Sequence, residues 1–314
     1  MIHLRVVVPE GSAPTLVDVV RDDPRTANLV VLRGAAIDPP GDLLLCDVAR
    51  EATSDVIARM RACGLDERAS ISIQDIDVIE SAAADRAERA APGSPDDGIV
   101  WDQVLLRARS DARASWAYYT FMCLATLIAA IAVITDSAIL VVGAMVVGPE
   151  FGPVAATAVG IVLGRADLVR RALQLLLLGF VVAIVVTTMA SLVGRMAGWV
   201  TAADVEADRP LTGFIWAPDR WSLVVALLAG AAGVLSLTAG RANALVGVFI
   251  SVTTVPAAGN LGLALAVGAG DEITGAVTQL GVNLAGMVLA GCVVLALQRV
   301  LTTERARRIR HVQP

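Results

Sequence analysis

The chain has 314 residues, of which 56% are hydrophobic and 18% are charged, and its formal net charge is -5. Its mean hydropathy is +0.70. Because an ordinary soluble domain has about 25% charged residues, this composition disfavours soluble single-domain enzymes, disordered chains and disulfide-rich secreted scaffolds. We therefore expect an integral membrane protein.

Residues 1–81 contain short alternating patterns that predict a soluble domain. Strands are predicted over residues 3–8, 29–36, 42–48 and 70–79, and helices over 15–21 and 54–63. This βαββαβ order is typical of an α+β ferredoxin-like domain, in which two helices cover one face of a four-stranded antiparallel sheet. The domain has no phosphate-binding loop, histidine cluster or row of surface aromatic residues, so we expect no cofactor, no metal and no nucleic-acid partner.

Residues 82–115 connect the two predicted domains. Residues 82–98 are charged and rich in alanine, and they end in Pro, Gly and Ser, which indicates a linker. Residues 99–115 have apolar residues at helical spacing together with three arginines, which predicts an amphipathic helix that leads to the bilayer. At the other end, residues 301–314 are expected to form a basic cytoplasmic tail.

Residues 116–300 are expected to form a membrane domain with about six spans, since about 20 apolar residues cross the hydrocarbon. The candidate spans are residues 116–135, 138–163, 170–193, 221–240, 243–268 and 275–298. Arginines cluster before the first span, between the second and third, and after the sixth, while Arg241 lies between the fourth and fifth. The positive-inside rule then places both termini in the cytoplasm of a multi-pass protein in the inner membrane.

The six spans divide into two sets of three. Because each set has an odd number of spans, the second set must be inverted in the membrane relative to the first. The sequence from Gly143 in span two is weakly similar to the sequence from Gly247 in span five, a comparison that aligns Gly152 with Pro256. Inverted repeats with Gly- and Pro-interrupted helices are typical of secondary transporters, whose binding site lies between the breaks. The sequence therefore predicts two inverted three-helix repeats with broken second helices, although a pair of packing kinks would give the same pattern.

Glu150 is the main candidate for an ionisable functional residue. A carboxylate midway along a span is energetically costly unless it is protonated, paired or hydrated. Two roles remain open for it: a protonated structural donor to a broken-helix carbonyl, or a proton or cation site. The candidate residues of a solute or ion pathway are Pro149, Glu150, Gly152, Pro153, Thr253, Thr254, Pro256, Asn260, Gln279 and Asn283. Asp136 and Ser137 are expected to cap a helix, and the small residues of span four to serve helix packing or a subunit contact.

The segment 136–164 resembles a bacterial and archaeal membrane family known as domain of unknown function 389. The matching signature is an Asp-Ser start, a Gly-Ala-Met step and two prolines four apart, here Asp136, Ser137, Gly143, Ala144, Met145, Pro149 and Pro153. In the second half, Gly247, Pro256 and Asn283 match, whereas Ala257 replaces a second proline and Glu150 replaces an apolar residue. The resemblance implies the membrane architecture, with a cytoplasmic ferredoxin-like domain in some members, and it implies no substrate.

The leading functional hypothesis is a transporter or channel for a small solute or ion, regulated by the cytoplasmic domain. The alternative is a membrane sensor or scaffold that transports nothing and whose soluble domain binds a small molecule or partner. An enzyme is not expected, because HExxH and GxSxG motifs are absent and neither His3 nor His311 lies in a span. The expected partners are the lipid bilayer, further copies of the same chain and an unidentified small solute or ion.

Overall fold

The computed structural model of the protein describes residues 1–9, 13–65, 69–91, 93–94, 98–239 and 252–312, with side chains up to residue 302. Two compact units are formed. The first consists mainly of Met1–Val104, and the second of Leu105–Leu237 together with the described residues from Val252 onward.

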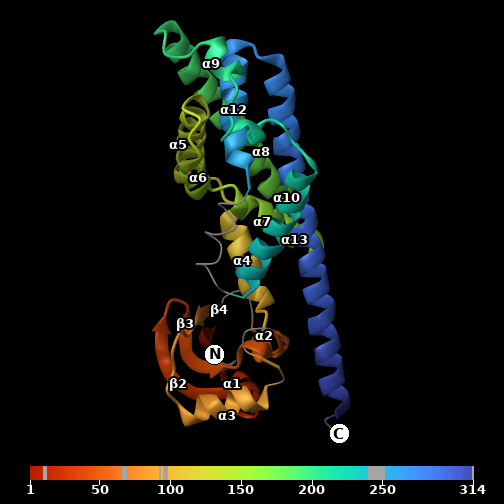
Figure 1. The fold of residues 1–314 in the computed structure, drawn as a ribbon. Coiled ribbons are helices and arrows are strands. Elements are labelled where there is room, and N and C mark those ends of the chain that lie inside the picture. The colour runs from red at the N-terminus through yellow and green to blue at the C-terminus, as the bar shows by residue number, and fades with distance from the viewer. Residues whose placement is uncertain (10–12, 66–68, 92, 95–97, 240–251, 313–314) are drawn as a thin grey trace. The chain divides into compact units, whose positions relative to one another are not determined.

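The first unit contains a four-stranded antiparallel sheet with strand order β2-β3-β1-β4 (Figure 1). Its elements are β1 (Ile2–Pro9), α1 (Ala13–Arg21), β2 (Thr26–Ile37), β3 (Pro40–Val48), the 3-10 helix η1 (Arg50–Ala52), α2 (Thr53–Ala62) and β4 (Ser70–Asp75). The predicted four-stranded antiparallel sheet is confirmed. Its last strand ends at Asp75, four residues earlier than we expected from the alternation.

The core of this unit lies on one face of the sheet. Every second residue of β1 from Ile2 is fully buried: Ile2, Leu4, Val6 and Val8. They form one hydrophobic cluster with Leu16 of α1 and with Ile57 and Met60 of α2. Since side chains alternate across a strand, this spacing sends the apolar set of β1 toward the two helices.

The stretch that we interpreted as a linker contains a helix, α3 (Ala82–Ala90). Ser81 begins it as N-cap, because its side chain accepts a hydrogen bond from the backbone amide of Ala84 at 3.3 Å. Ala84 and Ala87 are buried, and the helix packs against β2 and β3. The high alanine content favours a helix, and this outweighs the charge pattern that suggested a linker.

The second unit is helical. Its elements are α4 (Trp101–Asp111), which begins in the first unit, α5 (Trp116–Ile134), α6 (Ala138–Val147), α7 (Phe151–Val162), α8 (Ala166–Met196), α9 (Ala202–Glu206), the 3-10 helix η3 (Gly213–Ile215), α10 (Arg220–Thr238), α12 (Thr254–Val267) and α13 (Gly270–Val312). Among the described residues, four helices are long and apolar enough to cross a membrane: α5, α8, α10 and the part of α13 up to Thr302.

The second predicted span is broken. Its two helices, α6 and α7, are bent by 53° relative to each other, and together they would make a fifth span. The fifth predicted span, residues 243–268, contains the short helix α12 of 14 residues. Arg241 and Gly247, on which the predicted topology and repeat also rest, lie outside the described residues.

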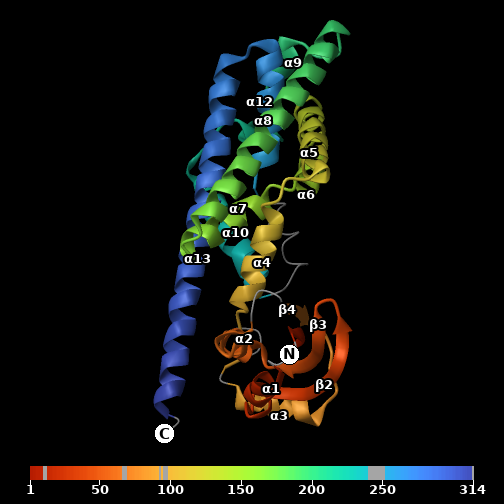
Figure 2. The same cartoon turned by 180° about the vertical axis from the view of Figure 1, so that it is seen from behind.

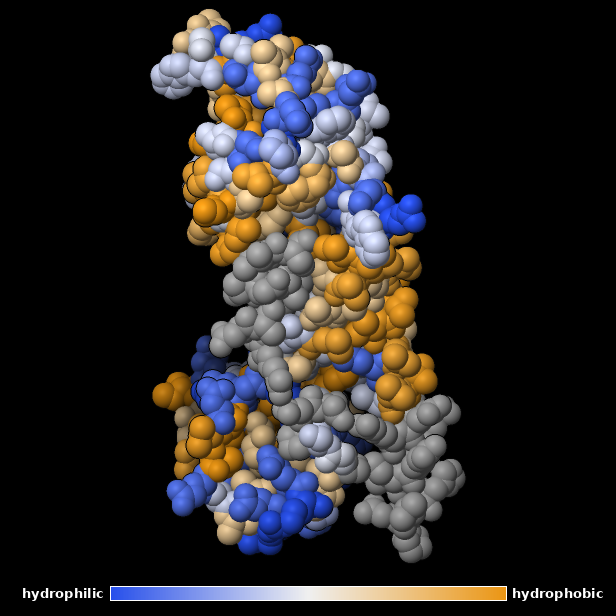
Figure 3. All heavy atoms as spheres, viewed as in Figure 1, coloured by the Kyte–Doolittle hydropathy of each residue, from blue (hydrophilic) through white to orange (hydrophobic). Residues whose placement is uncertain are grey.

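The short helices α7 and α12 lie in the interior of the helical unit. All but two of the 14 residues of α12 are buried, and α8 contacts both α7 and α12 (Figure 2). By contrast, α8 and α13 expose large apolar side chains, such as Leu177 at 61% and Val293 at 59%. Figure 3 shows hydrophobic side chains over much of the visible surface of this unit. Such an apolar exterior is consistent with a multi-pass membrane protein.

Small residues permit close approach between these helices. A Cβ atom on Gly230 of α10 would lie 2.6 Å from the Cα atom of Met287 in α13. A Cβ atom on Gly259 of α12 would lie 2.7 Å from the Cβ atom of Ala129 in α5. The interpretation of the small residues in α10 as helix-packing positions is therefore supported for Gly230.

Candidate functional site

The break between α6 and α7 brings Glu150 against the start of α12. Glu150 is the N-cap residue of α7, and its exposed fraction is only 6%. Thr254, the first residue of α12, donates a hydrogen bond from Oγ1 to Glu150 Oε1 at 2.8 Å. The other carboxyl oxygen, Oε2, is buried and has no hydrogen-bond partner. The two broken segments therefore meet at a carboxyl group that retains one unused oxygen.

A second polar group lies directly beside this contact. Thr253, the N-cap of α12, accepts hydrogen bonds at Oγ1 from Gln279 Nε2 at 2.8 Å and from Asn283 Nδ2 at 3.0 Å. Gln279 and Asn283 are one turn apart on α13, and each is 2% exposed. Gln279 Oε1 is buried without a partner. Because buried polar atoms normally have partners, the unpaired oxygens of Glu150 and Gln279 make this region a candidate site for water or a ligand.

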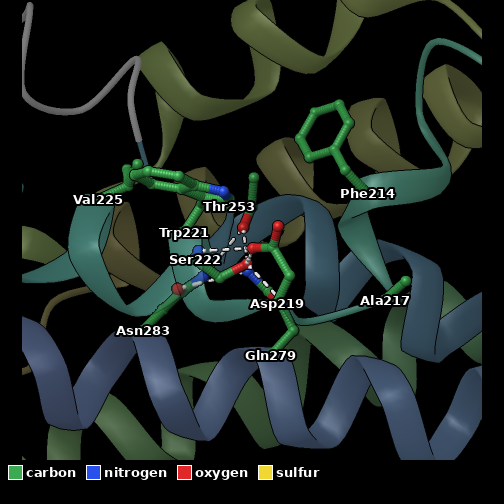
Figure 4. Close-up of a pocket in the computed structure, with 9 residues that line it drawn as sticks. All are labelled: Phe214, Ala217, Asp219, Trp221, Ser222, Val225, Thr253, Gln279 and Asn283. Atoms are coloured by element: carbon green, nitrogen blue, oxygen red, sulfur yellow. Dashed lines mark hydrogen bonds between the residues drawn. The ribbon is translucent and has the colours of Figure 1, made fainter.

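A pocket with a cavity volume of about 280 Å³ opens onto this polar group. Figure 4 shows that α13 contributes Gln279 and Asn283, α10 contributes Trp221, Ser222 and Val225, and the preceding segment contributes Phe214, Ala217 and Asp219, with Thr253 between them. The backbone amide of Ser222 donates to Asp219 Oδ1 at 2.8 Å. This bond is the main reason that the pKa of Asp219 is lowered, so the carboxylate at the pocket remains ionised near neutral pH.

Asn260 belongs to a different buried network from the other predicted site residues. Arg209 donates to Asn260 Oδ1 at 3.0 Å and forms an ion pair with Glu272, while Asn260 Nδ2 donates to Glu272 Oε2 at 2.9 Å. The side chains of Arg209 and Glu272 are 3% and 6% exposed. This arrangement joins the segment that follows α9 to the start of α13 and to α12. Glu272 is therefore buried in the first turn of α13.

Asp136 and Ser137 have separate roles. Ser137 is the N-cap of α6 and accepts a hydrogen bond from the Leu140 amide at 3.4 Å, as predicted. Asp136 has a positive φ of 43°. Its carboxylate accepts a 2.8 Å hydrogen bond from Thr212 Oγ1 and a 3.3 Å hydrogen bond from the Leu211 amide. Asp136 and Arg209 therefore both hold the segment whose continuation forms one wall of the pocket.

The remaining predicted site residues shape the helix starts. Pro149 lies within the break, and Pro153 is buried in the first turn of α7. Pro256 is buried in the first turn of α12, also as the third residue of its helix. A Cβ atom on Gly152 would lie 3.2 Å from the Cβ atom of Asp111. Prolines are tolerated in a first turn because the amide there has no partner within the helix, so these positions favour new helix starts.

The sequence did not reveal several members of the site. Arg209 is one of three arginines in the loop of residues 194–220. Phe214, Asp219 and Trp221 occur at the junction of this loop and a span, where aromatic residues such as Trp are common. Their convergence depends on the path of the chain between α9 and α10. Within the residues that the structure describes, no group of three or more His, Cys, Asp or Glu side chains could hold a metal ion.

Comparison with known proteins finds a family match within the helical unit. Residues 145–289 match the family model described as a domain of unknown function (DUF389), so the resemblance found in the sequence is confirmed. The chain is 23% identical over 215 residues to an uncharacterized protein of Methanocaldococcus jannaschii, with 67% of this chain and 64% of that relative covered. The matched part is therefore less than two thirds of the length of that relative. No solved structure matches the chain.

Proposed function

Because residues 145–289 form a domain of the DUF389 family, which carries no assigned activity, we propose a function from the geometry of the site. The protein passes a small solute or ion across a membrane through the polar region where α7 and α12 begin. The observation that carries this proposal is the contact between Glu150 and Thr254 at the meeting point of two interrupted segments, with Glu150 Oε2 left without a partner.

The physical argument concerns the ends of the two short helices. The first amides of a helix have no partners within it and give its start a partial positive charge. In hydrocarbon, such groups are tolerated only where they pack within protein or face water. Neither N-cap side chain, Glu150 of α7 or Thr253 of α12, makes a hydrogen bond to the first amides of its own helix. These amides therefore lie at the same place as the carboxyl group of Glu150 and the hydroxyl groups of Thr253 and Thr254 without a side-chain cap. A solute that enters this region finds polar groups inside an otherwise apolar unit.

The transport proposal is tested with purified full-length protein in lipid vesicles. Stopped-flow swelling in a panel of small neutral and ionic solutes, together with a pH-sensitive dye inside the vesicles, reports solute and proton movement. Protein that is folded and correctly inserted but gives no flux above that of empty vesicles for any member of the panel would contradict the proposal.

Glu150→Gln then separates the two roles that the sequence left open. Glutamine retains the shape and still accepts a hydrogen bond from Thr254, but it cannot exchange a proton. If Glu150 carries a proton during transport, the variant keeps its fold and its flux becomes independent of pH. If Glu150 is a structural donor only, the pH profile of the flux is that of the wild type. Tyr118 interacts electrostatically with Glu150, and Asp111 lies beside Gly152. Tyr118→Phe and Asp111→Asn therefore serve as controls for a pH dependence that arises at a nearby group.

We also propose the finer architecture that the sequence predicted. The order of elements in the first unit and the strand order β2-β3-β1-β4 support a ferredoxin-like domain. In the second unit, α7 and α12 each begin after an interruption and carry proline as their third residue, which supports six spans in two inverted repeats. The matching prolines are Pro153 and Pro256, a register one residue different from the sequence comparison.

The proposed orientation has residues 1–115 and 299–314 in the cytoplasm and residues 194–220 outside the inner membrane, because arginine clusters alternate with span number. An engineered cysteine near Ala84 should be protected from an impermeant thiol reagent in intact cells. Modification of this cysteine without permeabilisation would contradict the proposed topology.

We further propose that copies of the chain associate and that the soluble domain regulates passage. Small residues on membrane helices permit close contacts between subunits. Native mass measurement in lipid particles gives the stoichiometry, and a monomer with full flux at high protein density would contradict the association.

A further inference from the structure

The pocket beside α10 combines aromatic walls with oxygen acceptors. Trp221 and Phe214 are 65% and 51% exposed, and Figure 4 shows their rings across the pocket from Gln279 and Asn283. Aromatic faces carry negative charge density and attract cations. The walls of the pocket therefore favour a positively charged ligand with a flat or apolar body.

The polar atoms of the pocket have the same preference. Asp219 supplies a carboxylate whose Oδ1 accepts hydrogen bonds from the backbone amide and hydroxyl of Ser222 at 2.8 and 3.1 Å. At the base, Gln279 is only 2% exposed, and its Oε1 atom is buried without a hydrogen-bond partner. Asn283 Oδ1 has only a long contact of 3.4 Å with Gln279 Nε2. These groups can accept hydrogen bonds from a donor-rich ligand.

Nine of the described residues line the pocket, and none of them is an arginine or histidine: Phe214, Ala217, Asp219, Trp221, Ser222, Val225, Thr253, Gln279 and Asn283. Within this described lining, an anion would meet the Asp219 carboxylate without a compensating cationic side chain. A bare metal ion would leave most of a cavity of about 280 Å³ unfilled and would make no use of its aromatic walls.

We propose that this pocket binds a small organic nitrogen cation with N–H donors, of the guanidinium type, as the solute that approaches the membrane site. The Asp219 carboxylate pairs with the cation, Gln279 Oε1 and Asn283 Oδ1 accept its remaining N–H groups, and the Trp221 ring stacks on its plane. A planar guanidinium suits both contacts, because it matches a carboxylate in bidentate geometry and stacks on aromatic rings. This inference names the substrate class of the proposed transport function and rests on it.

The test compares guanidinium with urea, which has nearly the same shape and no charge. Calorimetric titration of the full-length protein in lipid nanodiscs at low millimolar ligand, with chloride and ionic strength held constant, should show saturable binding of guanidinium and none of urea. Asp219→Asn should weaken guanidinium binding by about tenfold or more, as expected for loss of a charge-assisted hydrogen bond. Trp221→Leu should weaken it by about two- to thirty-fold.

Asp208→Asn is the matched control, because Asp208 is an exposed acid of the same segment that does not line the pocket. It removes the same surface charge and should leave the affinity within about twofold of wild type, the scale of a surface charge effect. Equal binding of urea, competition by potassium at equal concentration, or equal effects of Asp208→Asn and Asp219→Asn would overturn the inference.

Flux of labelled guanidinium into protein-containing vesicles separates this inference from the transport proposal. Binding that depends on Asp219 without flux above that of empty vesicles upholds the cation site and contradicts transport of this ligand class by the protein. Flux of another solute without guanidinium binding upholds transport and contradicts the cation site.

Discussion

The buried network of Arg209, Asn260 and Glu272 gives a quantitative prediction about the helical unit. Each single replacement, Glu272→Met or Arg209→Met, leaves one charge in a position where the side chain is 6% exposed or less. Removal of one partner from a buried ion pair costs about 3–5 kcal/mol, because the remaining charge has lost its compensation. The sum of the two single effects is therefore about 6–10 kcal/mol.

The double variant Arg209→Met with Glu272→Met should cost much less than this sum. It removes both charges, and the main loss is that Asn260 has neither of its two partners. An unsatisfied buried polar group costs about 1–3 kcal/mol. The coupling free energy between Arg209 and Glu272 should thus be at least about 3 kcal/mol, and adding Asn260→Leu should recover part of the remaining loss.

The assay is unfolding by sodium dodecyl sulfate in mixed lipid–detergent micelles, followed by far-ultraviolet circular dichroism for the wild type, both single variants and the double variant. The reasoning would be refuted if the loss of stability in the double variant equalled the sum of the two single-variant losses to within about 1 kcal/mol. Losses at independent sites add in this way, whereas losses at coupled charges do not. The same variants should weaken binding in the pocket, since Arg209 anchors the segment that carries Phe214 and Asp219.

Two further predictions concern a glycine and a buried aspartate. Gly148→Ala should destabilise the helical unit by about 1–3 kcal/mol and lower flux, because its Cβ would lie 2.7 Å from Val255 Cγ2 and would displace the Glu150 carboxyl. Asp23→Asn should destabilise the first unit by about 1.5–3 kcal/mol at neutral pH. Burial opposes ionisation of Asp23, but hydrogen bonds and charges from Arg25 and Arg59 outweigh it and lower its pKa. This stabilisation is present above the unfolded pKa of about 3.9 and is lost as pH falls through the lower folded pKa.

Matched measurements check both. Gly143→Ala is the control for the glycine, since a Cβ at this position would meet no atom within 4 Å. It should be neutral or stabilising by up to about 1 kcal/mol, and an equal loss in both variants would remove the steric explanation. For Asp23, hydrogen exchange of residues 2–9 in the full chain reports opening of the sheet. The difference between wild type and Asp23→Asn should shrink as pH falls from about 5 to about 3, and a constant difference would contradict the proposed origin of the stability.

The pattern along the chain predicted the strands of the first unit and the long apolar helices of the second, but it did not predict α3. Alternating residues from Ile2 to Val8 predicted a strand with one buried face, and the long apolar runs of α5, α8 and α13 predicted membrane helices, because local periodicity reflects the side chains that must be buried. Pro149 and Pro153 marked the break in the second span for the same local reason, since proline disturbs the preceding turn. The resemblance to the DUF389 family also depended on a contiguous motif.

The tertiary structure alone decided which of these elements meet. Glu150 and Thr254 are 104 positions apart in the sequence, and their hydrogen bond exists because two interrupted helices start at the same point. Nothing in the local sequence distinguishes Arg209, and its ion pair with Glu272 depends on the path of the chain. Likewise, Trp221 becomes a pocket wall only through the approach of α13. Contacts between distant segments depend on the packing of whole helices, which local periodicity does not encode, so the residues were visible in the sequence but their partners were not.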